Sequence, residues 1–463
     1  MQLKQSSSPD ANDGMEHLLP CRVPARFLKE SGRRHGLFQS NPCLLEAMLF
    51  FVFVSIFTTS CTHPNRNMRN KLVANEVTKS LASVDWEPKP RAIAEGSSAQ
   101  LVLRASEGIN MLYAMHTVTG NQDLFFANSH DMGDSFSKPI RVNTEDGELG
   151  AHGENDPQLL TGNGSQIYAL WEGNQDIKFS RSVNFGKSFS SPLRVNDNEQ
   201  KSYRSFFTMG VASDGAVYAA WLDGRDRDHN APGTSSLYIA KSSDQGASFG
   251  KNIRIAGNIC PCCHPALAFG NNGEVFITWR HVYADDERIV VVASSLDGGE
   301  TWSDPVRVTE KGWKINGCPH SGPTLGYIDG KLIVTWYTAE DGKAVLRAAR
   351  STDGGQTFEV FQSISAGVFD ATHPHMAIIQ NEAWIIFQGR DPDTGGGWNP
   401  ARPWLVRIPS DGAPTLPEPL PSSGENVIYP RIFPGTGGRI YTIWTEIDEK
   451  GPKLILCRGR IRQ

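Results

Sequence analysis

The segment "SHDMGDSF", residues 129–136, decides the fold because its pattern returns four more times along the chain. Each copy has Asp or Asn in third place and Gly in fifth place. Such a side chain accepts hydrogen bonds from nearby backbone N–H groups, and Gly accepts a positive φ, so each copy predicts a tight turn. The other copies are "SVNFGKSF" (182–189), "SSDQGASF" (242–249), "SLDGGETW" (295–302) and "STDGGQTF" (351–358).

A second repeat consists of short runs of β-branched and aromatic residues, spaced 50 to 58 residues apart. Each run has the length of a strand and is bounded by turn-forming residues. Seven such strands predict an all-β fold, a β-propeller of seven four-stranded antiparallel blades. The runs are "LYAMH" (112–116), "IYALW" (167–171), "VYAAW" (217–221), "VFITW" (275–279), "LIVTW" (332–336), "AWIIF" (383–387) and "IYTIW" (440–444).

Closure of the ring is also predicted from spacing. The aromatic residue that ends a turn motif is followed five positions later by arginine, as in Phe136 and Arg141, and Trp86 and Arg91 repeat this spacing without the motif. The last repeat ends after its third strand. We therefore expect residues 84–95 to supply the fourth strand, which leaves no unpaired edge between the first and last blades.

The N-terminal region predicts export. Residues 1–62 contain an uncharged apolar run, Ala47 to Phe57, which is short for a membrane span and suits an export signal. The run leads into "TTSC", which resembles a lipoprotein processing site, so we expect a cell-envelope protein, periplasmic or at the surface, attached to the membrane near Cys61; an uncleaved short anchor is the alternative. Residues 63–83 are expected to be a linker, and residues 84–463 the propeller. A net charge of −5 with interspersed signs argues against a nucleic-acid partner.

The turn motif matches the Asp-box, or BNR repeat, of the sialidase superfamily, and residues 84–463 resemble that family. Six blades, the number usual there, is the alternative count. The resemblance implies a tyrosine nucleophile activated by glutamate, an aspartate acid/base and three arginines that clamp a substrate carboxylate through paired donors. The segment "YPRIFPGTGGRIYTIWTE" (429–446) resembles the final-blade segment of the family, and it places the nucleophile at Tyr429.

The remaining site candidates lie on loops that begin the first strand of each blade or join its second and third strands. These loops converge on a central funnel, where propellers bind ligands. Asp156 is the acid/base candidate, and the clamp candidates are Arg204, Arg280, Arg390 and Arg431. The family's Arg-Ile-Pro segment is absent, and no glutamate matches the activating position. A sialidase-like hydrolase acting on a glycan and a non-catalytic propeller that binds a metal or a partner both remain open, and the oligomeric state is not set.

Four cysteines belong to the same predicted face. Cys260, Cys262 and Cys263 stand in "CPCCH" (260–264), and Cys318 stands on the loop that begins the next blade. Thiolates and imidazoles together favour copper(I) or zinc, with further candidate ligands at His264, His320, His373 and His375. A disulfide between Cys318 and one of the other three is the alternative in an exported chain. Either arrangement ties two blades together.

Overall fold

The computed structural model describes residues 84–462 apart from 105–107, 201, 228–234 and 392–398. The chain divides into two compact units, residues 1–64 and 65–463, and all described residues belong to the second. The predicted leader, the linker and Cys61 therefore lie outside the described residues. Within the described part, no helix is both long and apolar enough to cross a membrane.

The described residues fold into antiparallel sheets, four of which have four strands each. The first contains β3 (Ser97–Arg104), β4 (Gly108–His116), β5 (Gln122–Ser129) and β6 (Ile140–Arg141). The second contains β7 (Gln158–Thr161), β8 (Ile167–Gly173), β9 (Asp176–Ser182) and β10 (Leu193–Arg194). Two more contain β20 (Thr324–Ile328), β21 (Lys331–Thr338), β22 (Val345–Ser351) and β23 (Glu359–Ser363), and then β24 (Phe369–Ile379), β25 (Glu382–Arg390), β26 (Arg402–Pro409) and β27 (Glu418–Pro419).

A larger sheet of nine strands joins two such groups through one residue pair, Ile259 with His281. Its first group is β11 (Arg204–Val211), β12 (Val217–Asp223), β13 (Ser235–Ser242) and β14 (Ile253–Ile259). Its second group is β15 (Ala266–Phe269), β16 (Val275–Val282), β17 (Glu287–Ser295), β18 (Val306–Arg307) and β19 (Trp313–Lys314), with the short 3-10 helix η1 (Ala284–Asp286) between β16 and β17.

The last sheet brings the two ends of the described chain together. It contains β28 (Val427–Pro434), β29 (Arg439–Asp448) and β30 (Gly451–Ile461), with the 3-10 helix η2 (Thr436–Gly438) before β29. Strands β1 (Val84–Trp86) and β2 (Arg91–Glu95) both pair with β30. Trp86 lies opposite Gly459 and Arg91 opposite Leu456, so the N-terminal strands cover the outer edge of the final sheet.

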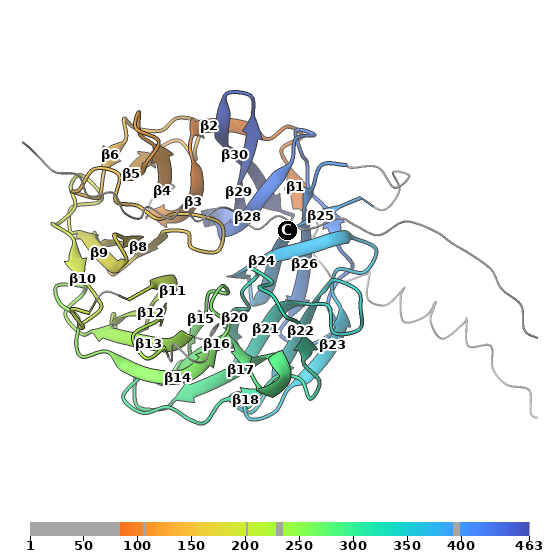
Figure 1. Ribbon diagram of the computed structural model, residues 1–463. Coiled ribbons are helices and arrows are strands. Elements are labelled where there is room, and N and C mark those ends of the chain that lie inside the picture. Colours follow the sequence, from red (N-terminus) through yellow and green to blue (C-terminus); the bar gives the residue numbers. More distant parts are fainter. Residues whose placement is uncertain (1–83, 105–107, 201, 228–234, 392–398, 463) are drawn as a thin grey trace, which may run out of the picture. The chain divides into compact units, whose positions relative to one another are not determined.

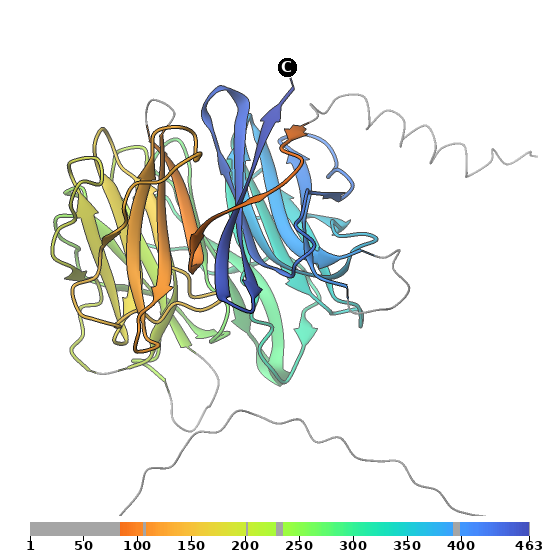
Figure 2. The same ribbon diagram turned by 90° about the horizontal axis from the view of Figure 1, so that it is seen from above.

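The first strands of successive groups face a common centre (Figure 1). Strands β3, β7, β11, β15, β20, β24 and β28 each contact the next in this order, and β28 also contacts β3. Figure 2 shows the same sheets from a perpendicular direction, standing side by side with β-turns at both ends.

The repeated aromatic runs form the second strand of each group, and they are buried on both faces. In β12 all seven residues are buried. Apolar side chains on both faces are the pattern of a strand enclosed between neighbouring sheets. Trp171, Trp221 and Trp279 are fully buried in three successive groups, so the core lies between adjacent sheets.

The five repeated turns share one set of hydrogen bonds at the end of the third strand of their groups. In the copy at 242–249, the Ser242 hydroxyl donates to Asp244 (2.8 Å) and accepts from the backbone N–H of Gly246 (2.8 Å). The Asp244 carboxylate also accepts from the hydroxyl and the backbone N–H of Ser248 (2.6 and 2.9 Å). These bonds from Ser248 lower the pKa of Asp244 to about 2. The turns lie at the opposite end of the strands from the candidate site and serve a structural role.

Candidate functional site

The strand register defines one equivalent position in or just before the first strand of every group. The position is defined by the pairing of the residue two places after it. That residue lies opposite the one directly before the large aromatic residue of the second strand, as Arg431, two places after Tyr429, lies opposite Ile443 before Trp444. Five of the seven stand directly before proline. They are Ser98, Asp156, Phe206, His264, Gly322, His373 and Tyr429.

Four of these positions have a left-handed backbone, with φ of 55° at Ser98, 51° at Phe206, 54° at His373 and 50° at Tyr429. Each lies within a break in the pairing register between the first and second strands. Non-glycine residues in this region cost roughly 1–3 kcal/mol each, and they concentrate at functional sites. The repeated bulge therefore marks this end of the strands as the candidate site.

Tyr429 lies deep in this region and is partly buried. Its backbone N–H donates to the side-chain oxygen of Gln388 (2.8 Å), and its ring lies 4.2 Å from the ring of His373 between centroids. The hydroxyl lies against Gly153, where a side chain would collide with it. Burial raises the pKa of Tyr429, and the nearby carboxylates of Glu154 and Asp156 raise it further. The phenol therefore stays protonated, which suits a proton donor better than a nucleophile.

Glu154 is a carboxylate near Tyr429 that was not among the residues predicted from the sequence. It is buried, and Oε2 accepts a hydrogen bond from the backbone N–H of Gly322 (2.6 Å). The same oxygen lies 3.3 Å from Nε2 of His264, and Oε1 lies 4.0 Å from Nε2 of His373. The only sequence signal was its position two residues before Asp156.

Asp156 and Arg431 form an ion pair beside Tyr429. Nη2 of Arg431 lies 2.5 Å from Oδ2 of Asp156. The Asp156 residue is only 2% exposed, and its Oδ1 atom has no hydrogen-bond partner among the described residues. Because buried polar atoms are normally paired, this oxygen lacks a partner that such atoms usually have.

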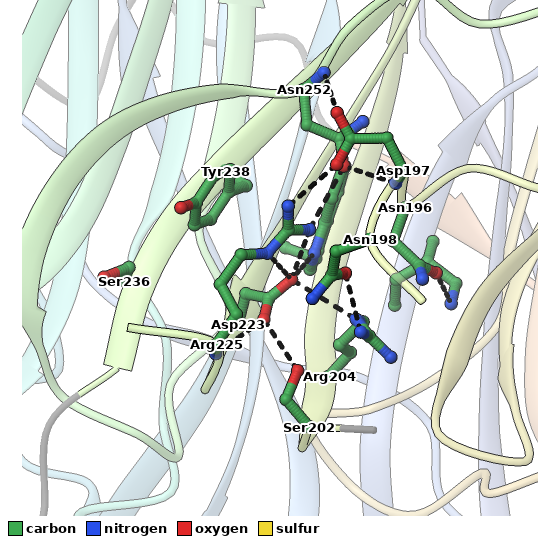
Figure 3. Close-up of polar contacts among 12 residues, drawn as sticks. Asn196, Asp197, Asn198, Ser202, Arg204, Asp223, Arg225, Ser236, Tyr238 and Asn252 are labelled. Atoms are coloured by element: carbon green, nitrogen blue, oxygen red, sulfur yellow. Dashed lines mark hydrogen bonds and ion pairs between the residues drawn. The ribbon is translucent and has the colours of Figure 1, made fainter. Parts of the chain in front are cut away.

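The other three predicted clamp arginines bind groups of the protein. Arg204 is buried, and it contacts Asp223 (3.4 Å), Asp176 (3.1 Å) and Asn198 (2.6 Å). Figure 3 shows Arg204 together with Arg225 around the carboxylate of Asp223.

Arg280 and Arg390 lie on second strands of other groups. Arg280 is buried and donates to the carbonyl oxygens of Tyr337 (2.7 Å) and Ser321 (3.3 Å). Arg390 pairs with Asp370 (3.0 Å). Of the four predicted clamp residues, Arg431 is the one that lies beside Tyr429.

Two pockets meet at His152, which lines both. The smaller, about 260 Å³, also includes Ser98, His116, Asp156 and Tyr429 in its wall. The larger, about 550 Å³, is also lined by Tyr203, Arg225, Arg227, Cys262, Cys318 and His320. His152 is exposed at the pocket mouth, and partial desolvation by its surroundings lowers the pKa of its imidazole, which is therefore neutral near pH 7 and can accept a proton. Cavities of this size and polarity suit a small ligand or a short oligomer.

The predicted cysteine cluster forms, and His320 is the candidate histidine that joins it. The sulfur atoms of Cys260, Cys262 and Cys263 lie 3.7, 3.7 and 4.0 Å from one another. A second group contains Cys262, Cys318 and His320, whose possible ligand atoms all lie within 4.8 Å. Every cysteine of the described part is unpaired. The sulfur separations are about twice the length of a disulfide bond, roughly 2.05 Å.

The other three candidate histidine ligands have different partners. The His264 ring contacts Glu154 and, at 3.0 Å, the carbonyl oxygen of Pro265. Nε2 of His373 lies 2.9 Å from the carbonyl oxygen of His320. Nδ1 of His375 accepts from the backbone N–H of Ile432 (3.2 Å). Of these three histidines, His264 and His373 lie near Glu154, and the His373 ring also contacts the ring of Tyr429.

Comparison with known proteins places the chain among structures of the same fold. No protein-family model and no curated protein sequence matches it. A protein of unknown function from Dyadobacter fermentans is similar at a TM-score of 0.50 and 16% identity, over 82% of this chain and 99% of the other. An ulvan lyase of polysaccharide lyase family PL25, bound to a fragment of glucuronate and 3-sulfated rhamnose, is similar at a TM-score of 0.51 and 10% identity, over 80% and 95%.

Sialidases are also found, among them that of Trypanosoma rangeli in complex with sialic acid, at a TM-score of 0.45 and 13% identity, over 79% of this chain and 60% of the other. At these identities the similarity concerns the fold alone: an all-β propeller-like architecture of antiparallel sheets, shared with the ulvan lyase.

Proposed function

We propose that residues 84–463 form a closed ring of seven blades with Asp-box turns, and that its central funnel binds and cleaves an acidic glycan. The seven-membered cycle of first-strand contacts supports the ring. The pairing of β1 and β2 with β30 supports its closure by the N-terminal strands. The common hydrogen-bond pattern of the five turns supports the Asp-box assignment.

The observation that carries the proposed activity is the group of Asp156, Tyr429 and His152 on one pocket wall. Asp156 offers a buried, unpartnered oxygen to a sugar hydroxyl, and Arg431 is the neighbouring cation for a sugar carboxylate. The ulvan lyase of the same fold was solved with a glucuronate-containing glycan, which is the same class of ligand.

The protonation states favour proton transfer over nucleophilic attack by tyrosine. The pKa of Tyr429 is raised, so its hydroxyl can protonate a leaving glycosidic oxygen. His152 is neutral and can take a proton from the sugar, as β-elimination from a uronate requires. Sialidase-like hydrolysis through a Tyr429 nucleophile needs the opposite change, a phenol activated by a neighbouring base. Among the described residues, no hydrogen bond joins the Tyr429 hydroxyl to a carboxylate.

The test supplies the full chain with a glucuronate polysaccharide and with a sialoside. New reducing ends report any cleavage, and ultraviolet absorbance of a conjugated unsaturated uronate reports elimination. We expect elimination, and a loss of about 100-fold or more with Tyr429→Phe, in line with the usual contribution of a general acid. Tyr327→Phe is the matched control, because this ring stacks on Phe276 on another blade.

Other outcomes have defined meanings. Sialoside hydrolysis that depends on Tyr429 would replace the lyase route with the sialidase route. Binding of an acidic glycan without turnover, measured by calorimetry and weakened by Asp156→Asn, would favour a non-catalytic propeller. Full activity of Tyr429→Phe, or neither binding nor cleavage of either substrate, would contradict the proposed site.

We also propose export and attachment to a membrane surface through the region near Cys61. The apolar run before Cys61 supports this location. Fractionation of the native cells checks it, and a full-length chain found in the cytoplasm would contradict it.

A further inference from the structure

We propose that Cys260, Cys262, Cys263 and Cys318 bind one zinc(II) ion in a tetrahedral site of four sulfur ligands. Zinc–sulfur bonds of about 2.3 Å in a tetrahedron place the sulfur atoms about 3.8 Å apart. The observed separations among Cys260, Cys262 and Cys263 are 3.7, 3.7 and 4.0 Å. Three sulfur atoms thus already form one face of the required tetrahedron.

The fold fixes these three sulfur atoms before any metal binds. The loop that carries them connects β14 to β15, and the backbone N–H of Cys260 donates to the carbonyl oxygen of Arg280 on β16 (2.9 Å). The three cysteines are 0%, 4% and 0% exposed, in chain order. A preorganised, buried set of thiols gives a metal site low reorganisation cost on binding.

The fourth ligand comes from the neighbouring four-stranded group. Cys318 lies on the loop before β20, and its sulfur is within 4.8 Å of the Cys262 sulfur. Cys318 is exposed, and the proposed site requires its sulfur to approach the buried three more closely. His320 is the other donor within 4.8 Å, but a fourth thiolate completes the all-sulfur set that is typical of structural zinc.

The charges around the cluster suit bound thiolates. Nη1 of Arg288 lies 3.0 Å from the sulfur of Cys260, and Arg288 is only 8% exposed. No carboxylate of the described residues forms an ion pair with Arg288. Buried charges are normally paired, and a metal-bound thiolate at Cys260 would give Arg288 a negatively charged partner. One zinc ion with four thiolates carries a net charge of −2, which Arg288 and the buried Arg280 partly offset.

The proposed site is closed and structural, and it borders the larger pocket. All four positions are filled by protein ligands, so the ion has no open position for a substrate. Cys262 and Cys318 both line the larger pocket, next to His152 and Tyr203. The bound ion would hold the loops of two neighbouring groups together at this wall. This inference does not depend on the glycan activity.

The experiment measures metal in the full chain, purified under reducing conditions without added chelator. Elemental analysis is expected to give one zinc per chain. Cys263→Ser should lose it, and Cys457→Ser should keep it, because Cys457 is also buried but lies on β30, away from the cluster. Cys318→Ser removes an exposed side chain, so it should fold and show zinc affinity reduced at least about 10-fold, in line with the loss of a ligand.

Cobalt(II) substitution reads the ligand set directly. Thiolate-to-cobalt charge-transfer absorption should appear in the full chain, weaken by about a quarter in Cys318→Ser, and remain unchanged in His320→Ala. Charge-transfer absorption unchanged in Cys318→Ser, together with altered cobalt d–d absorption in His320→Ala, would replace the fourth ligand by His320. Stoichiometric copper instead of zinc would overturn the choice of metal. Free thiols in all four cysteines after zinc reconstitution, or a disulfide found by mass spectrometry, would overturn the site.

Discussion

Asp223 is the residue around which the polar network in Figure 3 is built. It is fully buried, and its carboxylate accepts from the indole N–H of Trp221 (2.9 Å) and from Nη2 of Arg225 (2.7 Å). Nε of Arg204 lies 3.4 Å away, and the hydroxyl of Ser202 donates to the other oxygen (3.0 Å). One carboxylate thus holds the buried Arg204 and the half-buried Arg225 beside the larger pocket.

Replacement of Asp223 by alanine is expected to lower the free energy of unfolding by up to about 3–5 kcal/mol, the cost of breaking a buried ion pair. It removes the fully buried carboxylate that Arg204 and Arg225 share and leaves them only their more exposed carboxylate partners Asp176 and Asp197. Urea unfolding monitored by tryptophan fluorescence measures the change. Asp197→Ala is the control. The Asp197 carboxylate lies 2.8 Å from Nη1 of Arg225, and its side chain is 40% exposed. Loss of this more exposed ion pair should cost about 1 kcal/mol or less. Equal effects of the two substitutions would contradict this account.

The pH dependence of stability should follow the same carboxylate. Burial raises the pKa of Asp223, but hydrogen bonds from Arg225 and Trp221 outweigh it and leave the pKa lowered. A carboxyl whose pKa is lowered in the folded state contributes stability above its ordinary pKa near 4, and the contribution disappears as the pH falls through the folded value. Asp223→Asn should therefore show a shallower loss of stability below pH 4 than the native chain.

The sequence predicted which residues lie at this end of the strands. It did not predict which of them bind other groups of the protein instead of facing the candidate site. Tyr429, Asp156 and Arg431 meet, as the loop positions predicted. Arg204, Arg280 and Arg390 were placed on the same end of the strands, but a sequence does not show that Asp223, the carbonyl of Tyr337 and Asp370 bind them. Glu154 was missed because its role depends on the backbone N–H of Gly322, which is distant in the sequence.

At the scale of elements, the turn motifs and second strands were predictable because each depends on local chemistry. The buried second strands are continuous apolar runs, and the turns depend on residues within one octapeptide. The bulges in β3, β11, β24 and β28 were not predicted. They arise from pairing between strands. Their positive φ occurs at Ser98, Phe206, His373 and Tyr429, and none of these is glycine, the residue type that would predict a positive φ.

The buried serine that begins each turn motif should contribute more to the free energy of unfolding than the exposed hydroxyl residue near the end of the motif. Ser242→Ala removes the acceptor for the buried N–H of Gly246, so it should cost about 1–3 kcal/mol. Ser248→Ala removes an exposed hydroxyl whose bond to Asp244 competes with water, so its cost should be a few tenths of a kcal/mol. Paired urea titrations of the two variants measure the difference, and a larger cost for Ser248→Ala would contradict this order.

At the scale of the whole molecule, the N-terminal strands determine whether the last sheet has an exposed edge. Trp86 packs among apolar residues of the final two sheets, and Leu454 and Leu456 of β30 are fully buried. The spacing of Trp86 and Arg91 predicted this pairing because it repeats the spacing that precedes other fourth strands. The cysteine cluster belongs to the same scale, since Cys318 reaches Cys262 only when two neighbouring groups are packed together.

Deletion of residues 1–95 should therefore destabilise the final sheet, whereas deletion of residues 1–83 should not. The longer deletion removes β1 and β2, exposes the backbone groups of β30 and uncovers the side chains around Leu456; open sheet edges of this kind promote association. We expect a lower midpoint of thermal unfolding and aggregation in size-exclusion chromatography. The shorter deletion retains both strands and should unfold at the temperature of the full chain. Trp86→Ala in the full chain isolates the packing, with an expected cost of about 2–4 kcal/mol for a partly buried tryptophan. If the two deletion variants unfold at the same temperature, the pairing of β30 with residues 84–95 does not close the ring.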